Sequence, residues 1–101
     1  MNRGTIRRRR LFLLDALDAW NFIAKDSESR ADDFALKLED RAQIFADNPF
    51  LGVTRFPKFP NLRLFTFRQY IVIYEPISDG SGIDLVRLIH EARDYHRFFE
   101  D

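Results

Sequence analysis

The first quarter of the chain repeats apolar side chains with the period of an α-helix. From residue 10 to residue 25, apolar positions recur every three or four residues, and Asp15, Asp18 and Asn21 lie between them. The apolar positions are Leu11, Leu14, Leu17, Trp20 and Phe22 to Ala24. This spacing predicts an amphipathic helix with a broad apolar face.

A second helix follows the polar stretch "KDSESRAD". Ser29 with Asp32 three residues later resembles a capping box in which an aspartate replaces the usual Glu or Gln. The helical spacing then continues through Ala31, Phe34, Ala35, Leu38, Ala42 and Phe45. Pro49 disfavours helical geometry at Asn48, so the helix should end there. A link of about five residues predicts that the two helices lie antiparallel.

After an irregular connector at residues 49–61, the apolar period changes to two. Residues 62–67 (LRLFTF), 70–75 (YIVIYE) and 83–90 (IDLVRLIH) have the composition of β-strands. Arg68 and Gln69 form a tight link between the first two, and "SDGSG" forms a turn before the third. The stretch "TIRRRR" near the start can add an edge strand.

The predicted fold class is α+β, with residues 1–101 in a single domain. We expect an antiparallel β-sheet packed against an N-terminal antiparallel helical hairpin, in the order β-α-α-β-β-β, with a short C-terminal helix. The helical hairpin is the element available to cover the apolar face of the sheet.

Composition and charge narrow the classes of partner. The chain is 46% hydrophobic and 32% charged, has no cysteine and carries no net charge. Five of its 16 basic residues are arginines within the first ten positions, so the other 91 residues hold 11 basic and 16 acidic side chains, a net charge of −5. This acidic body disfavours nucleic acid as the main partner, although a local patch that includes the arginine run stays open.

The start of the chain has the basic and then apolar order of a signal peptide. Asp15 and Asp18 interrupt the apolar stretch, and no small-residue cleavage site follows, so we read it as mature sequence. No apolar run approaches the roughly 20 residues of a membrane span. The lack of cysteine is compatible with a reducing compartment, and we expect a cytoplasmic protein without a membrane partner.

The order of the elements, together with four sequence runs, resembles the ParE/RelE superfamily of bacterial toxins from type II toxin–antitoxin systems. The ParE branch fits better, and the resemblance covers about Asp15 to Phe99. The runs are DALDAWNFIAKDS, RADDFALKLEDRAQIFADNPFLG with its Asn-Pro-x-x-Gly exit, LRLFTFRQYIVIYEP and VRLIHEARDYHRFF. The run "IRRRRLFLL" departs from the family because it is more basic and then more apolar than the usual first strand and turn.

The resemblance implies a toxin that traps DNA gyrase on cleaved DNA by protein contact, with no cofactor. It also implies neutralisation by a cognate ParD-like antitoxin of the ribbon-helix-helix class, through which alone the toxin meets operator DNA. RelE-like members instead cut messenger RNA in the ribosomal A site. A degenerate toxin that acts only in an antitoxin or co-repressor complex is a third hypothesis.

The nuclease hypothesis needs a base, an acid and positive groups around a phosphate. The candidates by residue type are Arg63, Arg68, Arg87, His90 and Arg93. Residues 62–90 hold no lysine, however, and Glu75 and Asp84 offset two of their three arginines. The position six residues after Arg93, where RelE-like toxins often place a catalytic tyrosine, is Phe99, which cannot exchange a proton. We therefore expect no catalysis.

A protein-binding role accounts for arginines mixed with aromatic residues, which are typical interface anchors. The candidate target-binding residues are His90, Arg93, Tyr95, His96 and Phe99. The candidate antitoxin-binding residues are Trp20, Phe22, Arg63, Arg68, Tyr70 and Arg87.

Each of these candidates also has a structural interpretation. Tyr70 and Tyr74 share a strand face and can pack in the core, and a covered Arg87 would need a carboxylate partner. Arg93 and Asp94 can cap the last helix. His90 can be a satisfied strand-end histidine, since no other ligand type stands at metal-binding spacing.

Overall fold

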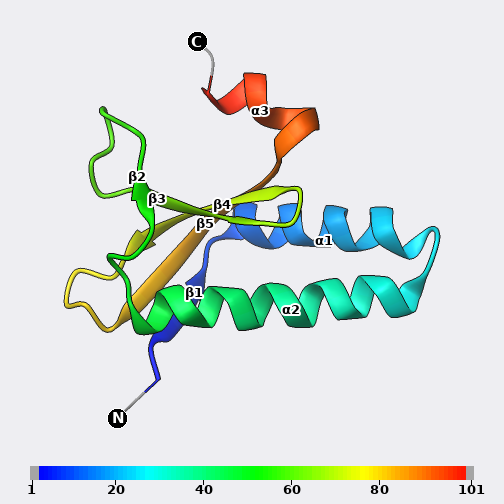
Figure 1. Cartoon of the computed structure of the whole chain (residues 1–101), viewed down its shortest axis with the longest axis horizontal. Coiled ribbons are helices and arrows are strands. Elements are labelled where there is room, and N and C mark those ends of the chain that lie inside the picture. The colour runs from blue at the N-terminus through cyan, green and yellow to red at the C-terminus, as the bar shows by residue number, and fades with distance from the viewer. Residues whose placement is uncertain (1–2, 100–101) are drawn as a thin grey trace.

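The computed structural model describes residues 3–99, apart from the side chains of Tyr95, Phe98 and Phe99 (Figure 1). It consists of a helical hairpin and a five-stranded sheet, with a short helix at the C-terminal end. In chain order the elements are β1 (Thr5–Arg8), α1 (Arg10–Ala24), α2 (Glu28–Asp47), β2 (Val53–Thr54), β3 (Arg63–Phe67), β4 (Tyr70–Pro76), β5 (Gly82–His90) and α3 (Glu91–Phe99). The α+β class, the helical hairpin and the terminal helix are confirmed.

The helical hairpin has the predicted antiparallel arrangement (Figure 1). The predicted cap of α2 is wrong, because the N-cap is Ser27, whose hydroxyl accepts a hydrogen bond of 3.1 Å from the backbone N–H of Arg30. Ser29 lies within the first turn instead. The other end of α2 falls at Asp47, directly before Asn48, as Pro49 requires.

The sheet has the strand order β1-β5-β4-β3-β2 and is mixed rather than purely antiparallel. β1 pairs with β5 in parallel, and every other pair is antiparallel. The helical hairpin and three successive antiparallel strands intervene between β1 and β5, so β5 returns in the direction of β1. A side chain at Gly82 would overlap the backbone of Thr5, which explains a glycine where the two strands meet. β2 was not expected, since its two residues lie in the proline- and glycine-containing connector.

Both faces of the sheet are buried, although only one apolar face was predicted. Val72 and Leu88 belong to the core cluster between the sheet and the helices. Ile71 and Ile73 belong to a second cluster on the opposite face, against which parts of the connector pack. A strand covered on both sides is apolar without alternation, which explains the run "YIVIY" in β4.

A β-bulge in β5 sets the direction of its side chains. Ile73 faces Arg87 and Tyr74 faces Leu85, so Val86 is the extra residue. The bulge lets Leu85 and Leu88 both join the cluster on the helix side although they are three residues apart. Arg87 lies opposite Ile73, and its guanidinium reaches Asp15 on α1.

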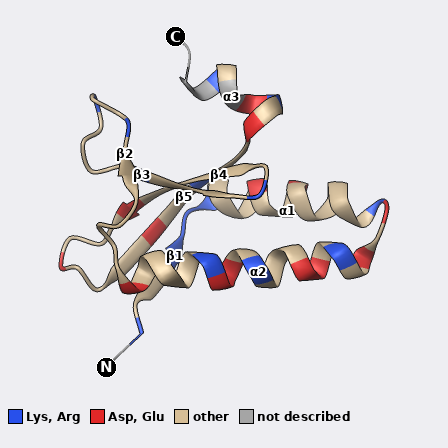
Figure 2. Ribbon diagram, viewed as in Figure 1, with Lys and Arg blue, Asp and Glu red and all other residues tan. Residues whose placement is uncertain are grey.

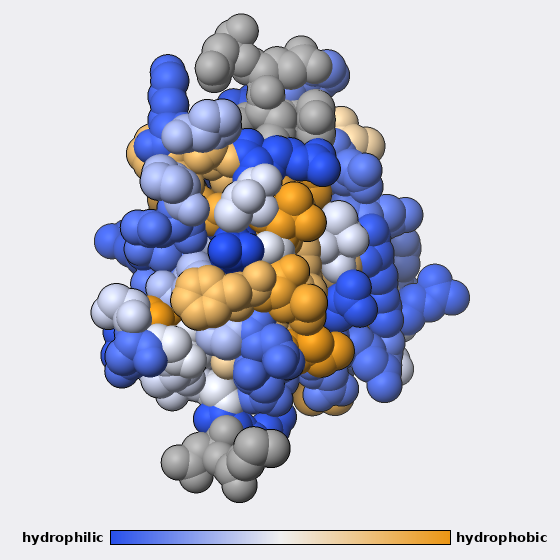
Figure 3. Space-filling view, turned by 60° about the vertical axis from the view of Figure 1, so that its left-hand side comes forward, coloured by the Kyte–Doolittle hydropathy of each residue, from blue (hydrophilic) through white to orange (hydrophobic). Residues whose placement is uncertain are grey.

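The connector between α2 and β3 leaves apolar side chains at the surface. Phe50, Leu51, Val53 and Phe59 are each at least half exposed. Figure 3 brings the side of β2 and the connector toward the viewer and shows hydrophobic side chains gathered in a band bordered by hydrophilic ones.

The hydroxyl of Tyr74 holds the exit of α2 against the sheet. It donates a hydrogen bond of 2.8 Å to the carbonyl oxygen of Pro49 and accepts one of 2.8 Å from the backbone N–H of Gly52. The Tyr74 side chain is fully buried, and this burial raises the pKa of its hydroxyl. The Asn-Pro-x-x-Gly run therefore wraps around one buried hydroxyl.

We expect Tyr74→Phe to lower the free energy of unfolding by about 2 kcal/mol, because two buried backbone groups lose their partner. Urea denaturation followed by circular dichroism measures the change. Tyr70→Phe is the matched control, since the buried Tyr70 has no hydrogen bond from its hydroxyl among the described residues, and it should cost about 0.5 kcal/mol or less. Equal losses in the two variants would contradict the role of the Tyr74 hydroxyl.

Candidate functional site

A hollow lies between α1, β5 and α3, at the end of the sheet from which the chain leaves for its last helix. Its lining includes Asp15, Phe22, Tyr70, Arg87, Arg93 and Asp94. The side chains come from four elements, α1, β4, β5 and α3. The helical hairpin, the sheet and α3 must therefore all be in place for the hollow to exist.

One ion pair forms the floor of this hollow. The carboxylate of Asp15 accepts hydrogen bonds from Arg87 Nε at 2.7 Å and Nη2 at 3.1 Å, and from the backbone N–H of Leu88 at 3.0 Å. The hydrogen bond that Arg87 donates to Asp15 raises the pKa of Arg87. This carboxylate is the partner that a covered Arg87 requires, and it fixes α1 on β5.

His90 connects the sheet to α3. Its Nδ1 accepts a hydrogen bond of 3.1 Å from the backbone N–H of Arg93, and the carboxylate of Asp94 accepts one of 3.3 Å from the backbone N–H of His90. The imidazole therefore caps the N-terminus of α3, and Asp94 completes the cap from the other side. The edge of the ring also packs on Tyr70, with centroids 5.1 Å apart.

The nuclease candidates do not all meet. Arg68, Arg87, His90 and Arg93 lie around the turn between β3 and β4 and the start of α3. Arg63 lies four residues before Phe67 on β3, about 13 Å along the strand. Its guanidinium donates to the carbonyl oxygens of Phe50 at 3.0 Å and Gly52 at 2.8 Å, which gives it a structural role in holding the connector.

The arginines around the hollow are matched by carboxylates. Besides the pair between Arg87 and Asp15, Arg68 lies 3.3 Å from Asp33, and Arg93 lies 3.7 Å from its neighbour Asp94. A phosphate would have to compete with an internal carboxylate at each of these three positions.

The acids on the sheet are matched as well. Arg9 contacts Glu75 at 3.1 Å and Asp84 at 2.9 Å. The hydrogen bond that Arg9 donates to Asp84 raises the pKa of Arg9. Part of the N-terminal arginine run thus binds within the molecule, where Arg8 also pairs with Glu39 on α2.

The exposed face of α1 carries a row of leucines. Leu11, Leu14 and Leu17 are 53%, 46% and 56% exposed, and Phe22 on the same helix is 57% exposed. The buried positions of α1 are Phe12 and Ala19, with Ala16 and Ile23 packed beside them. We call Leu11, Leu14 and Leu17 the leucine row. Figure 2 shows α2 charged along its length, whereas α1 is mostly uncharged.

A family model described as the ParE toxin of the type II toxin–antitoxin system, parDE, matches residues 6–95. The chain belongs to this family. It is therefore the toxin component of a type II toxin–antitoxin system, a class of proteins that work with an antitoxin. The match begins at Ile6 and so includes β1, whose sequence departs from the usual first strand. A search of curated proteins found no match.

The predicted target-binding residues of the toxin lie on α3 and the strand end before it. His90, Arg93 and His96 are there, and the latter two are exposed. Arg93 lies over the Phe22 ring, 5.9 Å from its centroid. The side chains of Tyr95 and Phe99 lie outside the described ones.

The predicted antitoxin-binding residues of the toxin are divided between surface and interior. Phe22 and Arg68 are exposed, whereas Tyr70 is only 5% exposed and packs in the core. Trp20 is half-buried, and its indole N–H donates to Asp32 at 3.0 Å, joining α1 to α2. Arg63 and Arg87 have the internal partners described above.

Sequence reasoning missed the exposure of the leucine row. The signal that could have found it is the second apolar face of α1, formed by Phe12, Ala16, Ala19 and Ile23 at helical spacing. A helix with two apolar faces can bury only one of them against a single sheet.

Two further findings concern the described residues alone. No three His, Cys, Asp or Glu side chains among them come together as a metal site. None of the helices among them has both the length and the apolar character needed to cross a bilayer.

We expect His90→Ala to fray the first turn of α3 and leave the sheet intact, because the loss of an N-cap costs about 1 kcal/mol locally. Hydrogen exchange at the backbone amide of Arg93 should become roughly fivefold faster. His90→Asn is the control, since Asn is a preferred N-cap residue and should restore slow exchange. Unchanged exchange in His90→Ala would show that the cap is not needed.

Proposed function

We propose that the toxin inhibits DNA gyrase by binding it, without catalysis by its own side chains. We also propose that a ParD-like ribbon-helix-helix antitoxin neutralises it by covering the leucine row. The observation that carries the proposal is the leucine row itself, an apolar surface on a helix whose other face already forms the core. Apolar surface of this kind is typical of protein-binding sites.

The state of the charged groups supports binding over RNA cleavage. A ribonuclease site stabilises a phosphate with free cations and moves protons through a base and an acid. In the hollow, Arg87 and Arg93 each have a carboxylate within 4 Å, and the acceptor nitrogen of His90 is engaged in capping α3. The contacts of these three side chains stabilise the fold, which favours a structural role for them over a catalytic one.

The spacing of the leucine row suits a helical segment of the antitoxin. Leu11, Leu14 and Leu17 follow one another at intervals of three, so they form a ridge along α1. An amphipathic helix laid along such a ridge buries apolar area worth about 25 cal/mol per Å². Asp18 beside the row supplies an acidic group for a basic residue of the partner.

With the leucine row assigned to the antitoxin, we assign α3 to the contact with gyrase in the cytoplasm. Its exposed residues Arg93 and His96 stand on a helix that contacts β5 and few other elements. Operator DNA would be reached through the antitoxin, since Arg8 and Arg9 of the basic run are engaged within the molecule.

We expect the purified toxin to inhibit supercoiling by bacterial gyrase in the presence of ATP and to cause linear DNA to accumulate. The reason is that a protein trapped against the enzyme holds the cleaved DNA open. Agarose gels of the products measure both effects as the toxin concentration increases.

Two controls separate the alternatives. If toxin shown to be folded by circular dichroism leaves gyrase unaffected, the gyrase assignment is wrong, and toeprinting on translating ribosomes then tests the RelE-like cleavage of messenger RNA. A host that grows normally while making the toxin alone would identify a degenerate toxin that acts only in a complex.

We expect Leu14→Lys to weaken binding of the antitoxin about tenfold or more, because a charge would be buried at the centre of the apolar contact. Isothermal titration with the antitoxin encoded beside the toxin gene measures the change. Leu36→Lys on α2 is the matched control, because Leu36 is a more exposed leucine outside the row. Both variants should keep the free energy of unfolding within about 0.5 kcal/mol. Equal weakening by both would remove the leucine row from the interface.

A further inference from the structure

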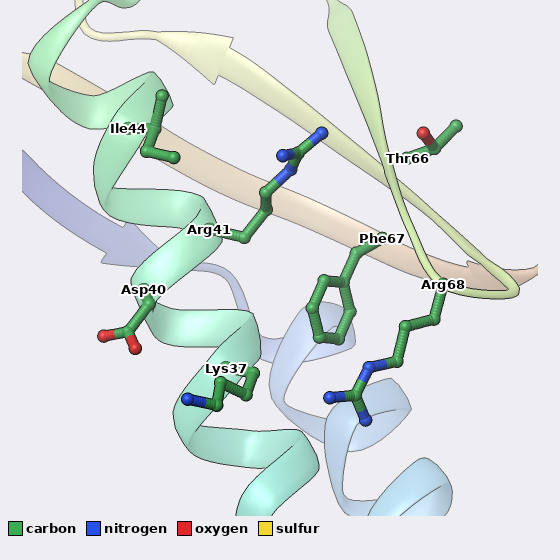
Figure 4. A pocket seen from close by; sticks show the side chains of 7 residues that line it. All are labelled: Lys37, Asp40, Arg41, Ile44, Thr66, Phe67 and Arg68. Carbon is green, nitrogen blue, oxygen red and sulfur yellow. The ribbon is translucent and has the colours of Figure 1, made fainter.

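A second groove runs between α2 and β3, on a part of the surface that the proposed function does not use. Lys37, Asp40, Arg41 and Ile44 line it from α2 (Figure 4). Thr66, Phe67 and Arg68 line it from the end of β3 and the turn that follows. The groove thus has one helical wall and one wall made by the edge of the sheet.

The sheet wall has an unpaired edge. β2 pairs with β3 only at Arg63 and Leu64, so the segment Phe65–Phe67 has β4 as its one neighbour among the described strands. The two-residue turn closes on the hydrogen-bonded pair of Phe67 and Tyr70. The preceding residue, Thr66, therefore points its backbone N–H and C=O away from β4, toward the groove.

Such an edge can accept another strand. An extended peptide that lies beside β3 would bond to the N–H and C=O of Thr66, which the register of the hairpin directs away from β4. The side chain of Thr66 is exposed, so the approach is open.

The groove is also positively charged. Arg41 extends from α2 toward β3, Arg68 lies beside Phe67, and the carboxylate of Asp40 is turned away from β3 (Figure 4). Neither Lys37 nor Arg41 has a carboxylate within 4 Å among the described residues. Arg68 makes one contact of 3.3 Å with the exposed Asp33, and a carboxylate of the partner would compete with Asp33 for this guanidinium.

The backbone at Arg68 is an independent sign that this side chain matters. Its φ is +54°, a left-handed conformation that glycine and asparagine adopt more readily than arginine. The turn alone would favour one of those residues. An arginine here places a guanidinium at the mouth of the groove, 5.0 Å from the centroid of the Phe67 ring.

We propose that this groove binds an acidic, extended segment of a protein partner, which adds a strand to β3 at Thr66. Alternate residues of an extended chain lie about 6.6 Å apart on one face, so successive carboxylates can reach Arg68 and Arg41, while Lys37 adds positive charge beside them. The side chains between the carboxylates would point to the other face of the sheet, where the side chain of Thr66 lies. The proposal does not depend on gyrase inhibition or on the leucine row.

The test uses a fluorescein-labelled peptide of alternating Glu and Val, with a peptide of alternating Lys and Val as its opposite in charge. We expect the acidic peptide to raise the fluorescence anisotropy and to bind more weakly as salt increases. In spectra of isotope-labelled toxin it should shift the amides of Thr66 to Arg68 and slow hydrogen exchange at Thr66.

Two variants separate the charge from the strand addition. Arg68→Asn keeps a residue that fits the left-handed backbone and should weaken binding about tenfold, while the fold becomes no less stable in urea. Thr66→Pro removes the outward N–H without touching the pairing with β4, and it should weaken binding while the charges remain. Arg55→Asn, a loss of the same charge outside the groove, is the matched control and should have no effect.

Several results would overturn the proposal. One is that the acidic peptide fails to bind at about 1 mM. Others are that the basic peptide binds equally well, or that the amide shifts map to α1 instead of β3. Tighter binding of a single-stranded oligonucleotide in the same groove would assign it to nucleic acid. An Arg55→Asn effect equal to that of Arg68→Asn would reduce the interaction to overall charge.

Discussion

The parallel pairing of β1 with β5 is the constraint on which the rest of the structure depends. It joins Thr5 to Gly82 across almost the whole chain and leaves the helical hairpin between two neighbouring strands. Arg9, directly after β1, then reaches Glu75 on β4 and Asp84 on β5, while Asp15 on α1 takes Arg87. If this pair opened, α1 would lose its fixed position, and the hollow and the leucine row would lose their geometry.

Internal ion pairs decide which cations can serve a partner. Among the arginines that suggest a nucleic-acid or RNA-cleaving protein in the sequence, Arg8, Arg9 and Arg87 are engaged with carboxylates inside the molecule. Lys37 and Arg41 on α2 drew no notice in the sequence, because a helix rich in charge usually reads as a solvated surface. Only the fold shows that they border an unpaired strand edge together with Arg68.

Much of the fold could be predicted from periodicity. The two helices, the three long strands and the last helix follow from local spacing, capping and turn residues. The parallel partner of β1 and the two-residue strand β2 could not be predicted, since both depend on contacts far away in the chain. Less of the candidate site than of the fold could be predicted from the sequence. In the sequence Asp15 is only a polar position in a helix, and the fold alone brings Arg87 to it from 72 positions away. His90 resembles a catalytic base until the structure shows that its ring caps α3.

The leucine row shows why fold and function separate in this toxin. A small domain usually needs every apolar face for its core. Here both faces of the sheet are already covered, and α1 docks through Phe12, Ala19 and smaller contacts. Leu11, Leu14 and Leu17 therefore add little to folding, and in water they favour aggregation or association. We propose that the antitoxin covers this surface. In that arrangement only the free toxin exposes the leucines to water, and the complex gains the apolar area that the fold left unused.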